Sequence, residues 1–133
     1  MKKLVLADDG HCFACGRRNP SGLGLDFRHG DGKVTAVFTP TKAHQGFKDI
    51  VHGGIITTVL DEAMIKAVLA RGIEAVTAEI TVRFKRPLHV GDLSTIEATI
   101  TTMGHRLIRA AAQMKGPDDG VIANAEAKLL RNG

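Results

Sequence analysis

Hydrophobic and polar residues alternate in two short runs within the first third of the chain, at residues 23–27 and 34–38. A period of two is typical of a strand that buries one face. The glycine-rich stretch at residues 30–32 separates the runs and favours a turn. We therefore expect a β-hairpin, with its apolar positions at Leu23, Leu25, Phe27, Val34, Ala36 and Phe38.

A longer apolar segment runs from Gly53 to Arg71 and is closed by Gly72. Its length and its closing glycine predict a helix of about 27 Å. Apolar residues occupy most of its circumference, so other parts of the chain must wrap around it. These residues are Ile55, Ile56, Val59, Leu60, Ala63, Met64, Ala67 and Val68.

Four further strands are expected after the helix, at residues 76–85, 93–103, 106–115 and 121–131. Short turns join them, which favours antiparallel neighbours. The element order is then ββαββββ, and it predicts an α+β fold in which about six antiparallel strands wrap around one long central helix. In the first of these four strands we expect one apolar face, made of Val76, Ala78, Ile80, Val82 and Phe84.

Small side chains are concentrated in the last two expected strands. They either leave room for a ligand or let the helix pack closely against the sheet, and the sequence leaves both roles open. The residues are Ala110, Ala111, Ala112, Ala123, Ala125 and Ala127.

Length and composition limit the classes of protein to which the chain can belong. Its 133 residues suit one domain, and its hydrophobic fraction of 44% and charged fraction of 24% are ordinary for a globular chain. The net charge of +4 suits an anionic small molecule. Nucleic acid is disfavoured as a partner, because the chain has no Trp or Tyr and only five Phe to stack on bases.

The first residues resemble the beginning of a signal peptide, but Asp8 and Asp9 interrupt the apolar stretch after four residues. The longest uncharged apolar run, from Gly53 to Leu60, is too short to cross a membrane. We therefore expect a cytoplasmic protein that has no membrane partner.

The segment with the clearest chemical meaning is His52-Gly53-Gly54, at the start of the predicted helix. Amides in the first turn of a helix have no partner inside the helix, and the helix dipole adds positive potential there. Such a site can stabilise an oxyanion. The alternative is a tight loop-to-helix junction that simply requires glycine.

Two acidic residues lie about two turns further along the predicted helix. The face of Asp61 holds no cation that would pair with its carboxylate, and an unpaired buried carboxylate is usually functional. Its alternative role is a structural hydrogen bond. Glu62 differs, because Lys66 follows it by four residues in the favoured orientation, so we expect these two to form a solvent-exposed surface pair.

The combination of His52-Gly53-Gly54 with Asp61, on the one central helix of a ββαββββ chain, resembles the hotdog-fold thioesterases. The closest similarity is to the phenylacetate-degradation type of acyl-CoA thioesterase, and it covers residues 23–133. Residues 1–22 resemble an N-terminal loop extension found in one branch of that family. The other matching motifs are Cys12-Phe13-Ala14-Cys15-Gly16, Leu60-Asp61-Glu62-Ala63, Phe84-Lys85-Arg86-Pro87 and Gly91-Asp92.

This resemblance implies an enzyme that hydrolyses an acyl-CoA thioester to a free acid and coenzyme A. The amide of Gly53 would polarise the thioester carbonyl, and Asp61 would act as general base or as nucleophile. His52 would help to hold the helix junction or the carbonyl. Thr77 would keep a hydroxyl near the attacking water, and Gln45 would stand where the family often has an asparagine. No cofactor is implied beyond coenzyme A as part of the substrate.

Basic residues near strand ends are candidates for binding the phosphates of coenzyme A, because Arg in particular pairs well with phosphate. Ordinary solvated surface charge is the alternative. The resemblance also implies a homo-oligomer, a dimer or a homotetramer built as a dimer of dimers, with each active site between subunits. The candidate substrate-binding residues are Gly54, Arg83, Lys85, Arg86, His105 and Arg106.

Two other functions remain open. A hotdog module that binds an acyl or aryl ligand, or that only oligomerises, would need no catalytic carboxylate. A hotdog acyl dehydratase would pair His44 with Asp61, although the loop around His44 lacks the prolines of such enzymes. The sequence also leaves open which acyl or aryl chain an enzyme would accept.

Cys12 and Cys15 could form half of a zinc site, completed by His11, His29 or a symmetry-related copy. Zinc usually takes four ligands, and the chain has no second pair of cysteines. We therefore expect no metal, and instead two small residues that pack a loop.

Overall fold

The computed structural model describes residues 2–133 and confirms the expected order of two strands, one helix and four strands. The two strands before the helix are β1 (Arg28–Gly30) and β2 (Lys33–Phe38), followed by the short 3₁₀ turn η1 (Lys42–His44). The remaining elements are α1 (Gly53–Leu69), β3 (Ala75–Phe84), β4 (Ser94–Met103), β5 (Leu107–Lys115) and β6 (Val121–Arg131).

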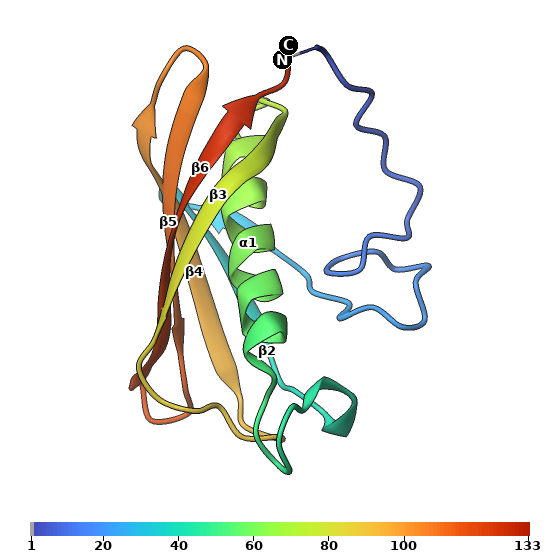
Figure 1. The fold of residues 1–133 in the computed structure, drawn as a ribbon, viewed down its shortest axis with the longest axis vertical. Helices are drawn as coiled ribbons and strands as arrows, with labels where there is room; N and C mark the ends of the chain where they lie inside the picture. The colour runs from blue at the N-terminus through green and yellow to red at the C-terminus, as the bar shows by residue number, and fades with distance from the viewer. Residues whose placement is uncertain (1) are drawn as a thin grey trace.

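The six strands form one sheet in the order β1-β2-β4-β5-β6-β3, and every neighbouring pair is antiparallel. The sheet curls, and α1 lies along its inner face (Figure 1). The α+β fold expected from the element order, with six antiparallel strands and one central helix, is therefore confirmed. β3 forms one edge of the sheet, so one of its sides has no strand partner within residues 2–133.

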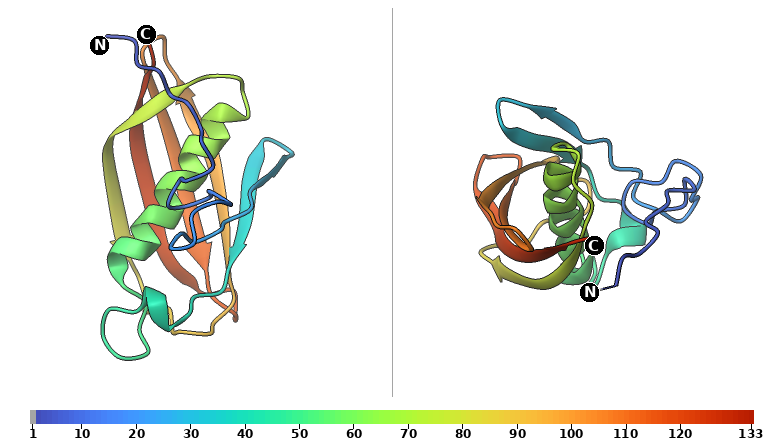
Figure 2. Two further views of the ribbon diagram at one scale, coloured as in Figure 1. Left: turned by 90° about the vertical axis from the view of Figure 1, so that its right-hand side faces the viewer. Right: turned by 90° about the horizontal axis from the view of Figure 1, so that it is seen from above.

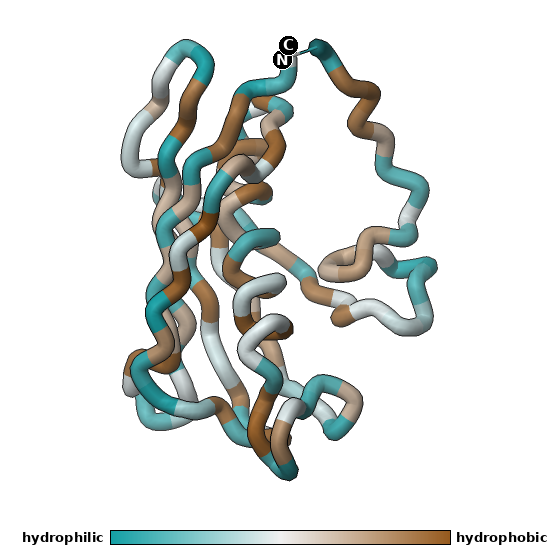
Figure 3. The backbone as a smooth tube through the Cα atoms, viewed as in Figure 1, coloured by the Kyte–Doolittle hydropathy of each residue, from teal (hydrophilic) through white to brown (hydrophobic). Residues whose placement is uncertain are grey.

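The buried core lies between α1 and the inner face of the sheet. Hydrophobic positions (brown) and hydrophilic positions (teal) alternate along the strands in Figure 3, as expected for strands that bury one face. Almost all of the expected apolar helix positions are buried, but Ile55 is only partly so, and α1 ends at Leu69 rather than at Arg71. The buried helix residues are Ile56, Val59, Leu60, Ala63, Met64, Ala67 and Val68.

Small side chains on β5 and β6 allow α1 to approach the sheet closely. Five of the six alanines in these strands are buried in the same cluster as the α1 side chains, whereas Ala111 is only partly buried. Close packing of the helix is therefore the role of these five residues, which are Ala110, Ala112, Ala123, Ala125 and Ala127.

The strand expected at residues 23–27 is not formed, and β1 is only three residues long. Instead, the amides of Leu23 and Leu25 donate to the carbonyl oxygens of Phe13 and Ala14, at 2.8 and 3.0 Å. The N-terminal loop thus takes hydrogen bonds that a neighbouring strand would have used. The apolar alternation was still informative, because Leu25 is buried.

A β-bulge interrupts the pairing of β3 with β6 between Thr77 and Glu79. The extra residue, Ala78, is exposed, and the face of β3 that meets α1 changes at this point. Thr77 reaches α1 before the bulge, whereas Ile80 packs against the core after it. The continuous apolar face expected over residues 76–84 is therefore wrong, because the bulge shifts the alternation by one residue.

Residues 2–27 contain no helix or strand and run along the side of α1 that faces away from the sheet (Figure 2), with residues 2–9 exposed and the later part of the loop packed on the core. Ala14 is buried and Cys12 is partly buried in the core cluster. The helix is thus covered by the sheet on one side and by this loop on the other, as its apolar circumference requires. Met1, the first residue of the expected extension, lies outside the described residues. No helix within residues 2–133 combines the length and apolar character needed to span a membrane.

Candidate active site

His52 caps the N-terminus of α1. Its backbone is extended (φ −62°, ψ 131°), and its Nδ1 accepts a hydrogen bond from the amide of Gly54 at 2.8 Å. A Cβ atom on residue 54 would lie 3.0 Å from this ring nitrogen, which is crowded, so glycine suits the position. His52 therefore holds the helix junction, one of the two roles expected for it. Because the Gly54 amide is already bonded, its assignment to substrate binding is corrected.

Gly53 is the first residue of α1, and its amide is available to a ligand. Among residues 2–133 no acceptor bonds to this amide, whereas the next three amides of the helix all have acceptors on His52. The positive end of the helix dipole lies at the same place and favours an oxyanion. The ring of Phe84 is the neighbouring side chain, 3.5 Å from where a Cβ on residue 53 would lie. This arrangement fits the oxyanion-binding role expected for Gly53.

Gln45 lies in the loop that leads into α1. Its backbone pairs with Val51, and the amide of His52 donates to the carbonyl of His44 at 2.9 Å, so Gln45 lies beside the helix junction. Its Oε1 accepts a hydrogen bond from the amide of Asp49 at 3.1 Å. That bond orients the side chain and leaves its NH₂ group as the part that can donate to a ligand.

Asp61 and Thr77 meet between α1 and β3. The hydroxyl of Thr77 donates to Oδ1 of Asp61 at 2.6 Å, and both residues are partly buried. Within residues 2–133, no cation pairs with this carboxylate. The Thr77 hydroxyl thus gives this carboxylate a hydrogen bond, which is the alternative role that the sequence left open for Asp61.

Gly53 and Asp61 are far apart within one chain. Eight positions separate them on a continuous helix, which corresponds to a rise of about 12 Å. A carbonyl bond is only about 1.2 Å long. The rise of the helix therefore separates the Gly53 amide of one protomer from its own Asp61 carboxylate by much more than the length of one carbonyl bond.

The basic side chains proposed for phosphate lie at two ends of the sheet. Arg83 and Lys85 are exposed at the end of β3, next to Phe84 and thus beside the N-terminus of α1. His105 and Arg106 are exposed in the turn between β4 and β5, at the opposite end (Figure 1). One chain therefore does not bring these four side chains to one site.

Arg86 has a structural partner. Its guanidinium forms an ion pair with Asp118, in the turn between β5 and β6, at 2.9 Å. It also lies so close to Gly120 that a side chain at that position would clash with it. The amide of Gly120 and the Arg86 guanidinium hold the pKa of Asp118 below its ordinary value. Arg86 thus links the end of β3 to this turn, and Asp118 is the group with which a phosphate would compete for its guanidinium.

His44 also has a structural role. Its Nδ1 accepts a hydrogen bond from the amide of Thr41 at 3.0 Å, which closes the η1 turn, and its ring packs on Phe38 at a centroid distance of 5.4 Å. Partial burial lowers the pKa of His44. No contact joins His44 to Asp61 among the described residues, so nothing in the geometry favours the dehydratase alternative.

Glu62 faces the N-terminal loop. Adjacent helix positions point about 100° apart, so Asp61 meets β3 while Glu62 meets Cys12. The Cys12 thiol donates to Oε2 of Glu62 at 3.2 Å, and within residues 2–133 Glu62 forms no ion pair with Lys66. The expected surface pair is therefore wrong. No local sequence pattern could have indicated this contact, because it joins residues 50 positions apart.

The surroundings of Glu62 change the proton affinities of two neighbours. Burial, a hydrogen bond with Cys12 and the Glu62 carboxylate raise the pKa of Cys15 to about 11. Burial by itself lowers the pKa of Lys66, but Cys15 and Glu62 outweigh it, so the pKa of Lys66 is raised overall. The Lys66 ammonium group therefore remains charged beside the two cysteines at neutral pH.

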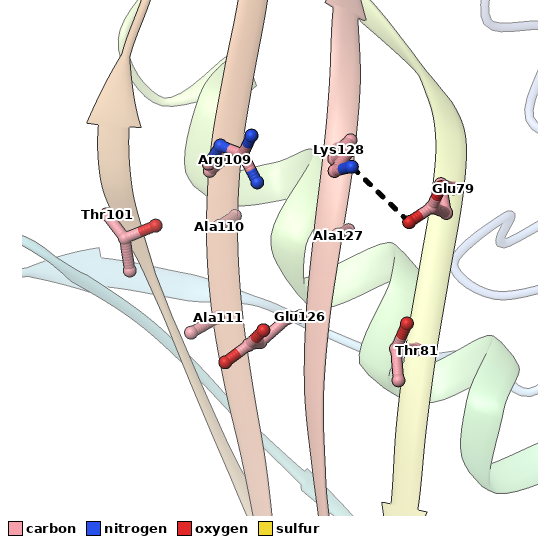
Figure 4. Close-up of a pocket in the computed structure, with 9 residues that line it drawn as sticks. All are labelled: Glu79, Thr81, Thr101, Arg109, Ala110, Ala111, Glu126, Ala127 and Lys128. Atoms are coloured by element: carbon pink, nitrogen blue, oxygen red, sulfur yellow. Dashed lines mark ion pairs between the residues drawn. The ribbon is translucent and has the colours of Figure 1, made fainter.

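A shallow polar hollow lies on the outer face of the sheet, away from α1 (Figure 4). It contains the ion pair between Lys128 and Glu79, with a distance of 3.6 Å. None of the candidate catalytic residues lines it, so it is separate from the candidate active site. Its lining residues are Glu79, Thr81, Thr101, Arg109, Ala110, Ala111, Glu126, Ala127 and Lys128.

The hotdog sheet and the aspartate on its central helix place the chain among the thioesterase-type hotdog proteins. A family model described as the thioesterase superfamily matches residues 48–123, more than half of the chain. The chain therefore belongs to the thioesterase superfamily. The resemblance seen in the sequence is confirmed, and with it the assignment to a family of enzymes.

Similar proteins support the same family. Acyl-coenzyme A thioesterase THEM4 from Xenopus laevis is 23% identical over 113 residues, and the match covers 82% of this chain and 50% of that protein. This chain thus spans about half the length of that relative. The solved structure of PaaI, from the phenylacetic acid degradation operon of E. coli, is 25% identical, with a TM-score of 0.78 and coverage of 84% and 81% of the two chains.

A protein from Streptococcus pneumoniae TIGR4 that is described as a hypothetical thioesterase, and was solved with coenzyme A, has the same fold. The two chains are 16% identical, the TM-score is 0.78, and the match covers 82% of this chain and 89% of that one. At this identity the likeness concerns the fold alone.

Proposed function

We propose that this chain is an acyl-CoA thioesterase that hydrolyses its substrate to a free acid and coenzyme A. Asp61 acts as general base or nucleophile, and the amide of Gly53 stabilises the oxyanion. The observation that carries this proposal is the position of Asp61, which is held by the Thr77 hydroxyl at 2.6 Å and, within residues 2–133, has no cation to neutralise it. A carboxylate so placed can accept a proton from water or attack a carbonyl.

The chemistry needs both groups at the same thioester. As water adds to the carbonyl carbon, its proton passes to Asp61 and the carbonyl oxygen becomes an oxyanion beside the Gly53 amide. Collapse of that adduct breaks the carbon–sulfur bond, and the proton goes to the sulfur of coenzyme A. In the nucleophilic version the Asp61 carboxylate attacks the carbonyl carbon, and the carbon–sulfur bond breaks to release the thiolate of coenzyme A, which takes a proton from solvent. Water then hydrolyses the mixed anhydride to the free acid and restores the Asp61 carboxylate.

Because one chain separates Gly53 from Asp61 by about 12 Å of helix rise, we place each site between two copies. The two copies would meet along β3, since it is a sheet edge of ten residues, and one of its sides has no strand partner in the part of the chain that the structure describes. Phe84, beside Gly53, and Thr77, bonded to Asp61, lie toward opposite ends of this strand. Antiparallel pairing of two β3 edges would bring the Phe84 end of one copy to the Thr77 end of the other.

Antiparallel pairing of two β3 edges also explains why the candidate phosphate-binding residues lie at two ends of the sheet in one chain. Arg83 and Lys85 lie near the Gly53 end of β3, while His105 and Arg106 lie at the other end of the sheet. In an antiparallel dimer, Arg83 and Lys85 of one copy would share a site with His105 and Arg106 of the other copy. They are the candidates for holding the phosphates of coenzyme A.

Related proteins support this proposal through their printed descriptions. THEM4 of Xenopus laevis is named as an acyl-coenzyme A thioesterase, and the Streptococcus pneumoniae protein was solved with coenzyme A. In two further structures of the Streptococcus protein, an aspartate and a threonine sixteen positions later are each replaced by alanine. The same interval separates Asp61 from Thr77.

The proposal is tested by measuring hydrolysis of a panel of short, long and aromatic acyl-CoAs by the wild type and by Asp61→Asn. Asparagine is neither base nor nucleophile at neutral pH, so turnover should fall by about 10²–10⁴-fold. Thermal unfolding and coenzyme A binding should stay near wild type in the same preparation. A folded Asp61→Asn protein with wild-type turnover would remove Asp61 from the mechanism. Binding without turnover of any acyl-CoA would favour a ligand-binding module.

Light scattering tests the location of the site. The protein should be a dimer, or a dimer of dimers, at the concentrations used for the activity measurements. An active monomer would contradict the shared site, because it would have to place Gly53 and Asp61 of one helix on one carbonyl.

A further inference from the structure

A second cluster of reactive side chains lies on the other side of α1 from β3. Cys12 and Cys15 belong to the N-terminal loop, and Glu62 projects from α1 to meet them. One ligand atom from each of the three residues lies within 4.8 Å of the others, and Cys12 Sγ is 3.2 Å from Glu62 Oε2. All three residues are partly buried. The thioesterase chemistry uses none of them.

The loop holds the two thiols close together without help from an ion. The amide of Gly16 donates to the carbonyl of Cys12 at 2.8 Å, which closes the Cys-x-x-Cys turn. A side chain at Gly16 would run into the backbone of Cys12, so the tight turn requires glycine. The residues between the cysteines, Phe13 and Ala14, accept the hydrogen bonds from residues 23 and 25 and thereby fasten the turn.

The donor set matches one class of ion. Two thiolates and one carboxylate are ligands of zinc and of related first-row dications, whereas magnesium and calcium prefer oxygen alone. The sequence by itself offers only the two thiols, but the fold adds the carboxylate from 50 residues away. Cys12, Cys15 and Glu62 would supply three ligands, and a water molecule would fill the fourth tetrahedral position.

The charges also balance. With both thiols ionised, Cys12, Cys15 and Glu62 would carry three negative charges, and a dication would leave one. The ammonium group of Lys66 lies beside Cys15 and supplies the compensating positive charge. Partly buried charges are tolerated when they are paired in this way. With the charge of Lys66 included, the net charge of the occupied site is zero.

We propose that Cys12, Cys15 and Glu62 bind a divalent ion of the zinc class, which fastens the N-terminal loop to α1. The ion would have a structural role, because it lies on the face of the helix that Asp61 does not use. Ion binding should therefore stabilise the fold, since a ligand that binds the folded state alone raises the free energy of unfolding.

The test uses the full-length chain, stripped of metal with a chelator under reducing conditions and then titrated with Co²⁺ and Zn²⁺. Co²⁺ should produce the thiolate-to-cobalt absorption band in the near ultraviolet, and Zn²⁺ should abolish it at about one equivalent per chain. Zn²⁺ should also raise the Tm. These readouts do not depend on thioester turnover, so their failure would leave the proposed enzyme untouched.

Variants identify the ligands. Cys15→Ser and Glu62→Gln should each weaken Zn²⁺ binding by about 10–100-fold or more, the lower bound being the loss typical of residues that only support a ligand. Glu126→Gln removes an exposed carboxylate from β6 and should bind as wild type does. Glu62→Gln keeps an acceptor for the Cys12 thiol, so it preserves the loop contact and provides a folded control if a cysteine variant unfolds.

Three results would overturn the proposal. The first is the absence of the cobalt band in the folded, reduced wild type. The second is equal zinc affinity in the wild type and Cys15→Ser or Glu62→Gln. The third is a Cys12–Cys15 disulfide in the isolated protein whose reduction produces no zinc affinity, which would identify the pair as a redox element.

Discussion

The hydroxyl of Thr77 donates to the carboxylate of Asp61 at 2.6 Å, across the gap between β3 and α1. The contact depends on a bulge one residue later, which lets Thr77 face the helix although the next inward-facing residue is Ile80. Thr77 is thus a positioning residue, because it fixes the carboxylate that the proposed reaction uses.

Replacement of Thr77 tests that role. Thr77→Val keeps the branched shape but removes the donor, and Thr77→Ser keeps the donor. A hydrogen bond to a charged group contributes about 1.5–3 kcal/mol, so kcat of Thr77→Val should fall by about 10–100-fold. Thr77→Ser should stay within a few-fold of wild type, a modest loss from its weaker β propensity. Equal losses in the two variants would assign Thr77 to packing and not to the carboxylate.

The role of the Gly53 amide can be tested with a substitution that removes its amide hydrogen. Gly53→Pro has no amide proton, yet proline is favoured at the first position of a helix. The preceding residue, His52, already has the extended backbone that proline requires of its neighbour. Loss of one oxyanion donor should lower kcat by about 10²–10³-fold.

Gly53→Ala is the matched control, because it retains the amide and places its Cβ at an ordinary 3.5 Å from the ring of Phe84. It should keep most of the wild-type turnover and a similar Tm. If Gly53→Pro is folded and as active as Gly53→Ala, another group must stabilise the oxyanion.

A shared site predicts rescue between two inactive variants. Asp61→Asn and Gly53→Pro should each be inactive as homodimers, but a mixed dimer contains one site with both intact groups. With random assembly and two-fold symmetry, co-expression should restore about one quarter of the wild-type activity. Differently tagged chains allow the mixed dimer to be purified, and its turnover per dimer should be about half that of wild type. A purified mixed dimer without activity would place both groups in one protomer's site.

Acid should weaken the fold through His44. Partial burial lowers the pKa of His44 below its ordinary 6.5, so between the two values the unfolded chain binds the proton more readily. The stability contribution of neutral His44 is therefore fully present above about pH 6.5 and is lost as pH falls toward the folded-state pKa. Protonation of Nδ1 would also break the bond from the Thr41 amide.

Tm should accordingly fall between about pH 7 and pH 5, and part of that fall should disappear in His44→Gln. His29→Gln, which changes an exposed histidine of β1, is the control and should keep the wild-type slope. An unchanged slope in His44→Gln would show that other groups set the acid sensitivity.

Periodicity was enough to predict the order of the elements and the central helix, because both depend on local alternation of apolar and polar residues. The chemistry of helix N-termini was enough to single out Gly53 as a candidate, and the lack of a cation on its helix face singled out Asp61. The opposite positions of Arg83 and His105 could also have been predicted, since strands that alternate in direction return the β4–β5 turn to the far end of the sheet.

Features that depend on contacts distant in sequence were missed. The bulge after Thr77 adds one residue to a strand whose alternation looks regular, so no local pattern marks it. The strand expected at residues 23–27 was replaced by pairing with the N-terminal loop, which competes for the same amides. Glu62 has Lys66 at an ideal spacing, yet tertiary packing places Cys12 against it.

The cap at the start of α1 also determines a tautomer. Because Nδ1 of His52 accepts the hydrogen of the Gly54 amide, the neutral imidazole must carry its own proton on Nε2. The exposed ring therefore presents a donor to solvent, one residue from the free amide of Gly53. His52 can in this way close the helix with one nitrogen and offer the other to an electron-rich oxygen. Protonation of Nδ1 would end the first role, because the ring would then have two donors and no acceptor.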